Sequence, residues 1–207
     1  MDRLAKPAEQ NQQTLEAKVR SASGWLFAIA VFTAVNSINY ILRLTDGYFV
    51  IGLGLTQFVE GVAPYFVTSF REGTIPIAYF LAFLVNAYII FAFVVFGYFA
   101  RRKLKAAFIL GGGIYLLDIA LLLYSEDYLG AAFHLWGLAA IVGGYRSLDS
   151  LSQLEADGDP DIYNASGSGP APAPLPEWAN SAFWAVSGVL ILVLVGLGGV
   201  FAFLLLA

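Results

Sequence analysis

Long runs of apolar residues dominate this sequence of 207 residues and limit what it can fold into. A helix needs about 20 predominantly apolar residues to cross the hydrocarbon layer of a bilayer, which is roughly 30 Å thick. Only 13% of the residues are charged, about half the usual fraction in a soluble domain. We therefore predict an all-α integral membrane protein with about five transmembrane helices. The predicted spans are residues 24–44, 76–100, 106–124, 129–145 and 181–207.

Changes in composition divide the chain into four parts. Residues 1–22 are polar and predict a cytoplasmic arm, whereas residues 23–147 hold the first four spans and predict a four-span core. Residues 148–180 are first acidic and then rich in Pro and Ala, which is typical of a linker. The last part, residues 181–207, is predicted to be a tethered transmembrane helix that can pack away from the core.

A further apolar segment, residues 49–70, is long enough to cross a membrane but poorly suited to doing so. Three glycines and Pro64 interrupt it. Gln57 and Glu60 would lie near the middle of the bilayer, where polar side chains cost ~2–3 kcal/mol each. We therefore predict that residues 49–64 form a re-entrant or interfacial helix on the outer side.

The distribution of Lys and Arg predicts the orientation, because these residues favour the cytoplasmic side. Basic residues precede the first span, cluster at residues 101–105 and follow the fourth span at Arg146. With a cytoplasmic N-terminus, only Arg43 and Arg71 of the 11 basic residues are external. We predict a cytoplasmic N-terminus and a periplasmic or external C-terminus. The linker composition and the absence of cysteine favour a bacterial inner membrane.

Polar side chains inside the predicted spans are candidate functional residues, because they are rare in lipid and normally face protein or water. On the first span, Asn36, Asn39 and Arg43 share one helix face with Tyr40. The polar residues of the other segments lie at a similar predicted depth, so we expect one outward-facing cluster. Its candidate members are Asn36, Asn39, Arg43, Gln57, Glu60, Asn86, Asp118 and His134.

These polar residues have both a structural and a chemical interpretation. Amides in membrane helices commonly form interhelical hydrogen bonds worth ~0.6 kcal/mol on average. Glu60 could pair with Arg43 or Arg71 near the interface. Asp118 could pair with His134 as a buried contact that orients the third and fourth spans. In the chemical interpretation, Glu60, Asp118 and His134 relay protons.

The residue types exclude most cofactor sites. The chain has no cysteine and 1 histidine, so thiolate-held metals, iron–sulfur clusters and sites with two histidine ligands are excluded. The acidic residues 157–161 alternate as in a calcium loop but lack its downstream glutamate, so we interpret them as linker. No haem, iron–sulfur or metal signature is present, and bound lipid is the expected ligand. Nucleic acid is not an expected partner.

Two stretches carry a family resemblance. The stretch FHLWGLAAIVGGY resembles the His-x-x-Gly helix of rhomboid-type intramembrane proteases, with His134 and Gly137 at the matching positions. The predicted membrane-dipping segment after the first span is also a rhomboid-like feature, and the resemblance implies a catalytic role for His134. The rhomboid Gly-x-Ser-Gly motif is absent, since the glycine run at residues 111–113 has no serine. Residues 36–60 are also similar to small uncharacterised bacterial multi-pass membrane proteins, which implies no activity.

The function predicted first is a non-enzymatic integral membrane accessory or structural subunit that associates with partner helices within the bilayer. It is favoured by the tethered last span and by the lack of a catalytic pattern. The alternative is a small transporter, channel or proton-relay protein that uses the polar cluster. An intramembrane enzyme would depend on His134. Four glycines of the last span are predicted to pack against another helix, from a membrane-protein partner or a second copy: Gly188, Gly196, Gly198 and Gly199.

Overall fold

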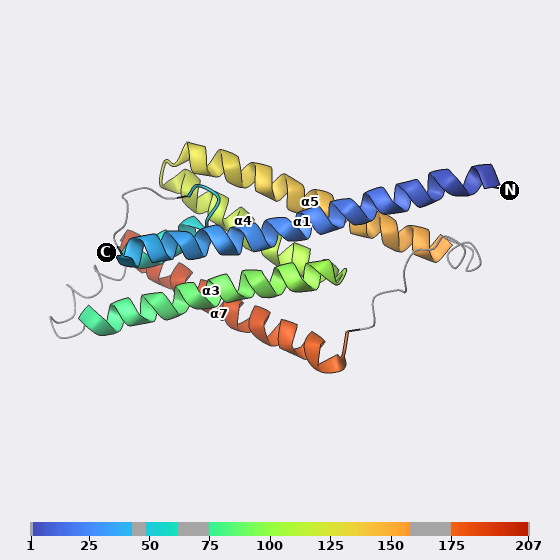
Figure 1. Cartoon of the computed structure of the whole chain (residues 1–207). Helices are drawn as coiled ribbons and strands as arrows, with labels where there is room; N and C mark the ends of the chain where they lie inside the picture. Colours follow the sequence, from blue (N-terminus) through green and yellow to red (C-terminus); the bar gives the residue numbers. More distant parts are fainter. Residues whose placement is uncertain (1, 43–48, 62–74, 158–174, 207) are drawn as a thin grey trace.

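The computed structural model describes residues 2–42, 49–61, 75–157 and 175–206, and these residues are almost entirely helical (Figure 1). A short helix at residues 54–61 follows the first long helix. In the described ranges, 5 helices are long and apolar enough to cross a membrane. The predicted all-α membrane class is therefore confirmed. The long helices are α1 (Asp2–Leu42), α3 (Ile75–Arg101), α4 (Lys105–Tyr124), α5 (Tyr128–Asp157) and α7 (Glu177–Leu206).

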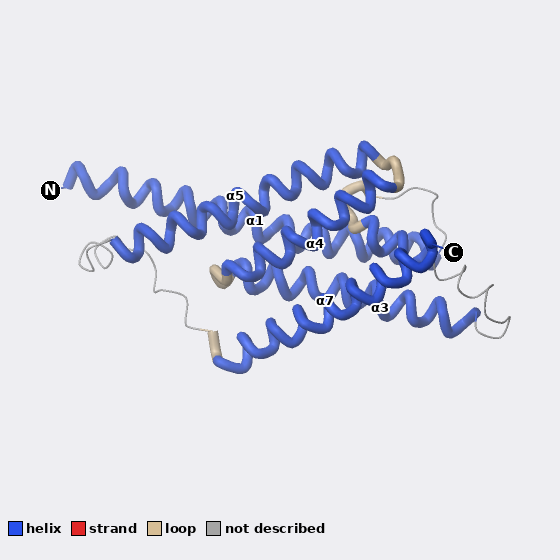
Figure 2. Tube along the Cα trace, turned by 180° about the vertical axis from the view of Figure 1, so that it is seen from behind, coloured by secondary structure: helices blue, strands red, loops and turns tan. Residues whose placement is uncertain are grey.

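Successive long helices alternate in direction along one bundle (Figures 1 and 2). The Arg101 guanidinium lies 4.7 Å from the ring centre of Phe27, whereas Asn86 lies opposite Ser37. These two contacts make α1 and α3 antiparallel. The chain consequently leaves α1 and enters α3 at the same end of the bundle. The two termini lie at opposite ends (Figure 1).

The C-terminal helix α7 lies against α3. The Phe183 ring packs edge-on against Phe96 and at a tilt against Phe99, with centroid distances of 5.9 and 5.1 Å. The Tyr88 hydroxyl donates a 2.7 Å hydrogen bond to the carbonyl of Val186. Phe183 also belongs to the main buried cluster. The last span is therefore docked on the core in this structure.

Helices α1 and α5 extend furthest beyond the predicted spans. The predicted arm, residues 1–22, is helical from Asp2 and continuous with the first span. Val19 and Ala22 are buried, because the apolar stripe of α1 continues past the predicted start of the span. Glu16 then forms a 3.2 Å ion pair with Lys103.

The predicted linker begins later than expected. Helix α5 continues to Asp157, because Leu148 and Leu151 are buried on one face of this helix. Asp149 forms a 2.6 Å ion pair with Lys105. The acidic composition of residues 148–157 therefore belongs to a helix whose other side packs on the core. The remaining linker residues 158–174 lie outside the described ranges.

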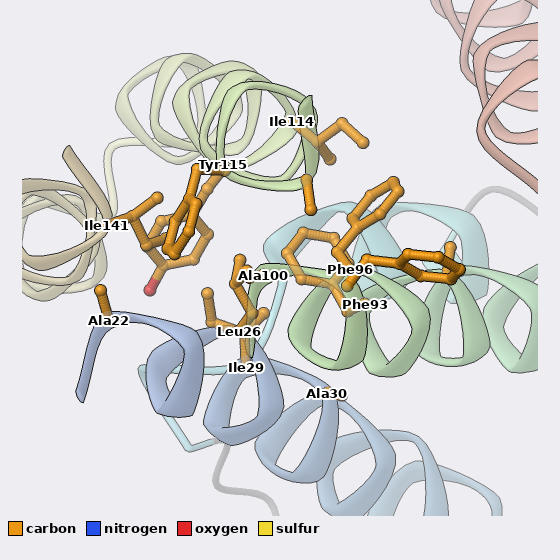
Figure 3. Packing of buried hydrophobic residues seen from close by; sticks show 14 of the residues in the cluster. Ala22, Leu26, Ile29, Ala30, Phe93, Phe96, Ala100, Ile114, Tyr115 and Ile141 are labelled. Atoms are coloured by element: carbon orange, nitrogen blue, oxygen red, sulfur yellow. The ribbon is translucent and has the colours of Figure 1, made fainter. Parts of the chain in front are cut away.

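The core combines aromatic residues with close helix approaches. Figure 3 shows Phe93 and Phe96 of α3 and Tyr115 of α4 beside Leu26 and Ile29 of α1. All five side chains are buried. The backbones of α1 and α5 come especially close at Gly144. A β-carbon at Gly144 would overlap Ala22 and lie 3.1 Å from the Phe108 ring, whereas one at Gly143 would meet open space.

We expect Gly144→Ala to destabilise the protein and Gly143→Ala to leave it as stable or more stable. Both substitutions raise helix propensity by up to ~1 kcal/mol, but only Gly144→Ala overpacks a contact, at a cost of roughly 1–3 kcal/mol. Thermal unfolding in mild detergent measures the difference. Equal unfolding temperatures for the two variants would contradict the close α1–α5 contact.

Candidate functional site

The candidate site surrounds residues 49–61, which we call the inserted segment. Residues 49–53 are non-helical, and residues 54–61 form the short helix. Gly52, Leu53 and Gly54 are buried. Polar side chains of α1, α3 and α4 contact this segment. A non-helical backbone among membrane helices needs internal hydrogen-bond partners, because its amide groups cannot reach water.

Helix α1 binds the backbone of the inserted segment at two places. Asn36 pairs with Phe49 in both directions: its Nδ2 donates to the carbonyl at 2.9 Å, and its Oδ1 accepts the amide at 2.7 Å. The Thr33 Oγ1 accepts the amide of Leu53 at 2.9 Å and donates to the Ile29 carbonyl at 2.7 Å. Thr33 and Asn36 are buried. Their side chains thus replace water for the non-helical residues.

Helix α4 caps the short helix through Asp118. The Asp118 Oδ2 accepts the amide of Gly54 at 3.0 Å, and its Oδ1 accepts the amide of Leu55 at 2.7 Å. The first amides of a helix lack partners within that helix, and a carboxylate there also interacts favourably with the helix dipole. Asp118 therefore satisfies two buried amides from a residue that is distant in the sequence.

Asp118 also contacts the histidine of α5. The His134 Nε2 lies 2.8 Å from Asp118 Oδ2, with both side chains at most 1% exposed. Nε2 nevertheless has no aligned hydrogen-bond partner in the described part of the chain, so the contact is close but off-axis. The His134 Nδ1 lies 2.9 Å from the Gly130 carbonyl and must carry a hydrogen there, because a carbonyl only accepts. The Tyr115 ring stacks on the imidazole, with centroids 4.3 Å apart.

A proton on either facing atom of the Asp118–His134 pair would remove the repulsion between the lone pairs of Nε2 and Oδ2, which lie 2.8 Å apart. With that proton, the pair is a carboxylate beside an imidazolium, or a carboxylic acid beside a neutral imidazole. Both forms have zero net charge, which suits complete burial.

A second polar pair lies near the end of the short helix. The Asn86 Nδ2 donates to Glu60 Oε1 at 2.7 Å and lies 3.4 Å from Ser37 Oγ and 3.5 Å from the Thr56 carbonyl. The Tyr40 hydroxyl donates to the backbone carbonyl of Glu60 at 3.1 Å. Glu60 and Asn86 are buried. This pair ties the inserted segment to α3.

Two glycines permit the close approach of the inserted segment. A β-carbon at Gly52 would overlap Asn36 Nδ2 and lie 3.0 Å from the backbone of Phe32. A β-carbon at Gly54 would lie 2.7 Å from the Leu122 side chain. The glycines that interrupt the apolar segment in the sequence therefore allow its backbone to lie directly on α1 and α4.

The structure brings most of the predicted polar residues to the inserted segment. Asn36 and Asp118 bind its backbone, His134 binds Asp118, and Glu60 pairs with Asn86. These residues form two groups, one at each end of the short helix, where one cluster was predicted. Asn39 and Gln57 are half-buried. Residue 43, its predicted pairing with Glu60, and residues 62–64 of the predicted helix lie outside the described ranges.

Sequence reasoning missed three residues of the site. Thr33 and Ser37 lie one turn from Asn36 and Tyr40 on the same face of α1, and Tyr115 lies one turn before Asp118 on α4. Hydroxyl groups in helices often bond to the carbonyl of the preceding turn, so they gave no distinct signal. Helical spacing relative to the amides and carboxylates was the signal that could have found them.

Comparisons with known proteins give no relative for this chain. No family model matches it, and neither a curated protein nor a solved structure does. The resemblance to rhomboid-type proteases thus depends on His134, Gly137 and the membrane-dipping segment predicted after the first span. Both ring nitrogens of His134 face other groups, Asp118 and Gly130, so its described contacts do not include the serine that such a protease needs.

We expect Thr33→Val to lower the free energy of unfolding by roughly 1–3 kcal/mol, because it leaves the buried amide of Leu53 without an acceptor. Thr14→Val is the matched control. The Thr14 hydroxyl donates to the Gln10 carbonyl at an exposed position of the same helix, and surface changes usually stay within about 0.5 kcal/mol. Thermal unfolding in detergent compares the two. Equal losses would show that Thr33 does not support the inserted segment.

Proposed function

We propose that this protein is a non-enzymatic integral membrane subunit whose α7 associates with a transmembrane helix of another membrane protein. The observation that carries the proposal is the division of α7 into a docked face and an open face. Ala179, Phe183 and Leu190 are buried toward the core. The opposite side of the same helix carries two glycines.

The open face of α7 consists of Gly188, Leu192, Val195 and Gly199. Each residue turns a helix by about 100°, which places these four roughly opposite Leu190. Leu192 and Val195 are 72% and 68% exposed. A β-carbon at Gly188, Gly196, Gly198 or Gly199 would meet no atom within 4 Å among the described residues. These glycines therefore serve no close contact with the described chain, and small residues on a membrane helix favour close approach of another helix.

The polar interior supports a structural role for the core. Asn36, Thr33 and Asp118 use their hydrogen-bonding atoms on the inserted segment. Asp118 also faces His134, so the described contacts of this group involve no substrate. We infer that the inserted segment is re-entrant. Because α1 and α3 are antiparallel, the chain enters and leaves this segment on the same side of the bundle.

The orientation we propose has the N-terminus in the cytoplasm and the C-terminus outside, in a bacterial inner membrane. It rests on the basic residues at one end of the bundle, where Lys103 pairs with Glu16 and Lys105 with Asp149. Arg101 and Arg102 lie over the rings of Phe27 and Tyr98. Lys and Arg near span ends favour the cytoplasmic side.

A lipid chain is the small ligand that we propose for the core. A cavity of about 340 Å³ lies between the short helix, α4 and α7. Apolar side chains form nearly all of its wall. They include Leu55 and Phe58 of the short helix, Leu121 of α4 and Leu197 of α7. An apolar cavity beside membrane helices suits an acyl chain rather than a polar solute.

The second candidate function is a proton relay, and the Asp118–His134 pair favours it. Its single proton can reside on either residue without changing the net charge. A relay needs further proton carriers on both sides of this pair. The described contacts of His134 lead to the Gly130 carbonyl and the Tyr115 ring, which are not proton carriers at neutral pH, so the subunit is the function we put first.

We expect Gly188→Leu and Gly199→Leu to remove a co-purifying protein that the wild type retains in nanodiscs made directly from native membranes. The added side chains would hold a partner helix away from the open face of α7. Gly113→Leu is the control, because Gly113 also meets open space but lies on α4. Mass measurement of the intact particles identifies the assembly. A wild-type particle that contains one copy of this chain and no other protein would refute the proposal. A particle with two copies of this chain would show that the partner helix belongs to a homodimer.

The proposed topology is tested by labelling single cysteines, which the chain lacks naturally. Ser125 and Gln153 are exposed near opposite ends of α5. We expect Ser125→Cys and Ser69→Cys to react with an impermeant maleimide from outside, and Gln153→Cys to react only after the membrane is opened. If residues 49–61 crossed the membrane, a cytoplasmic N-terminus would place Ser69→Cys and Ser125→Cys inside and Gln153→Cys outside, so the reverse labelling pattern would refute the re-entrant topology.

A further inference from the structure

The Glu60–Asn86 pair leaves two buried oxygen atoms without a partner. The Asn86 Nδ2 donates to Glu60 Oε1 at 2.7 Å. The other atoms of the same two groups, Glu60 Oε2 and Asn86 Oδ1, have no hydrogen-bond partner in the described part of the chain. If Glu60 is ionised, both atoms can only accept. A buried acceptor without a donor destabilises the folded state, and does so more when it is charged.

One added proton provides the missing donor. A carboxylic acid and a primary amide can form a closed pair, in which the amide donates to one carboxyl oxygen and the other carboxyl oxygen donates back to the amide oxygen. The two atoms without partners are the two that this second hydrogen bond requires. We propose that Glu60 and Asn86 form a proton-binding site, in which Glu60 is a neutral carboxylic acid at neutral pH and donates from Oε2 to Asn86 Oδ1.

The described surroundings of Glu60 bring no positive charge to replace this proton. Helix α1 presents Ser37 and the Tyr40 hydroxyl, and α3 presents Asn86. Asp118 and His134 lie at the other end of the short helix, on the amides of Gly54 and Leu55. Helix α7 approaches the short helix through Leu197 beside Val59. All the side chains described beside the carboxyl of Glu60 are therefore uncharged at neutral pH.

Burial of Glu60 favours the neutral form of its carboxyl group. Desolvation raises the pKa of Glu60 above its usual value, and hydrogen bonds from Ser37 and Asn86 lower the pKa by less. The folded state thus holds this proton more tightly than the unfolded chain does. The stability that the proton contributes is complete below the usual pKa of a glutamate and is lost as the pH rises through the raised pKa.

Loss of the proton would weaken the packing of the short helix against α3. An ionised Glu60 would place an unpaired charge in an apolar core and face Asn86 Oδ1 with a second acceptor. Both effects weaken the contact between the inserted segment and α3. The site therefore couples proton binding to the position of residues 54–61, and it does so whether or not α7 has a partner.

Infrared spectroscopy of protein labelled with carboxyl-¹³C glutamate tests the protonation state directly. At neutral pH in choline chloride we expect one ¹³C-shifted carbonyl band of a protonated carboxylic acid. That band should disappear as the pH is raised and be absent from Glu60→Gln. Glu177→Gln, which alters an exposed carboxyl on α7, should keep it. A wild-type spectrum with carboxylate bands alone at neutral pH would overturn the proposal without requiring any variant.

Sodium ions provide the second arm of the same experiment. If the oxygens of Glu60 and Asn86 bind a metal cation instead, sodium chloride at constant pH should abolish the acid band, whereas choline chloride should not. That result would overturn the assignment to a proton. Thermal unfolding adds an independent reading, because Glu60→Gln imitates the neutral acid. Wild type should lose stability relative to Glu60→Gln as the pH rises, whereas Glu177→Gln should follow the wild type.

Discussion

The hydrogen bonding of one non-helical backbone segment explains most of the polar residues in this bundle. The backbone of residues 49–55 lies among helices of apolar composition, where each amide group without a partner costs several kcal/mol. Asn36, Thr33 and Asp118 supply partners to Phe49, Leu53, Gly54 and Leu55. The glycines at 52 and 54 let the backbone come close enough to receive them. Without this set of contacts the segment could not leave water.

The need for partners to these backbone amides also places a requirement on the side chain that faces Asp118. A carboxylate suits two adjacent amides at a helix start, but a buried carboxylate also needs a positive charge or a proton. His134 meets this need at 2.8 Å. The imidazole is held in turn by the Gly130 carbonyl and by the ring of Tyr115. The role of Asp118 in binding two amides thereby accounts for a histidine on α5 without any catalytic role.

The sequence predicted the spans and the polar residues but not the hydrogen-bond partners of those residues. The spans follow from apolar length, and α4 begins within one residue of its predicted start. Helices α1 and α5 run further because amphipathic turns such as those of Val19 and Leu148 lie beyond the apolar runs. Asn36, Asp118 and His134 stood out because polar groups are rare in such runs. The partner of Asn36 is a backbone group of Phe49, and a backbone partner leaves no mark in the sequence.

The two ends of the short helix are held in physically different ways. Its start is fixed by the Asp118 carboxylate, which accepts two amides and faces an imidazole, so a proton shared by that pair would move without changing the net charge. Its end depends on Glu60. The second carboxyl oxygen of Glu60 and the side-chain oxygen of Asn86 both lack a donor among the described residues. A change in protonation therefore alters the net charge only at the end. Val59, beside Glu60, packs with Ala82 of α3 and Leu197 of α7. Proton binding at Glu60 would thus act on one contact of α7, a helix that Phe183 and the Tyr88 hydroxyl also hold on α3 and whose open face we propose as the site of helix association.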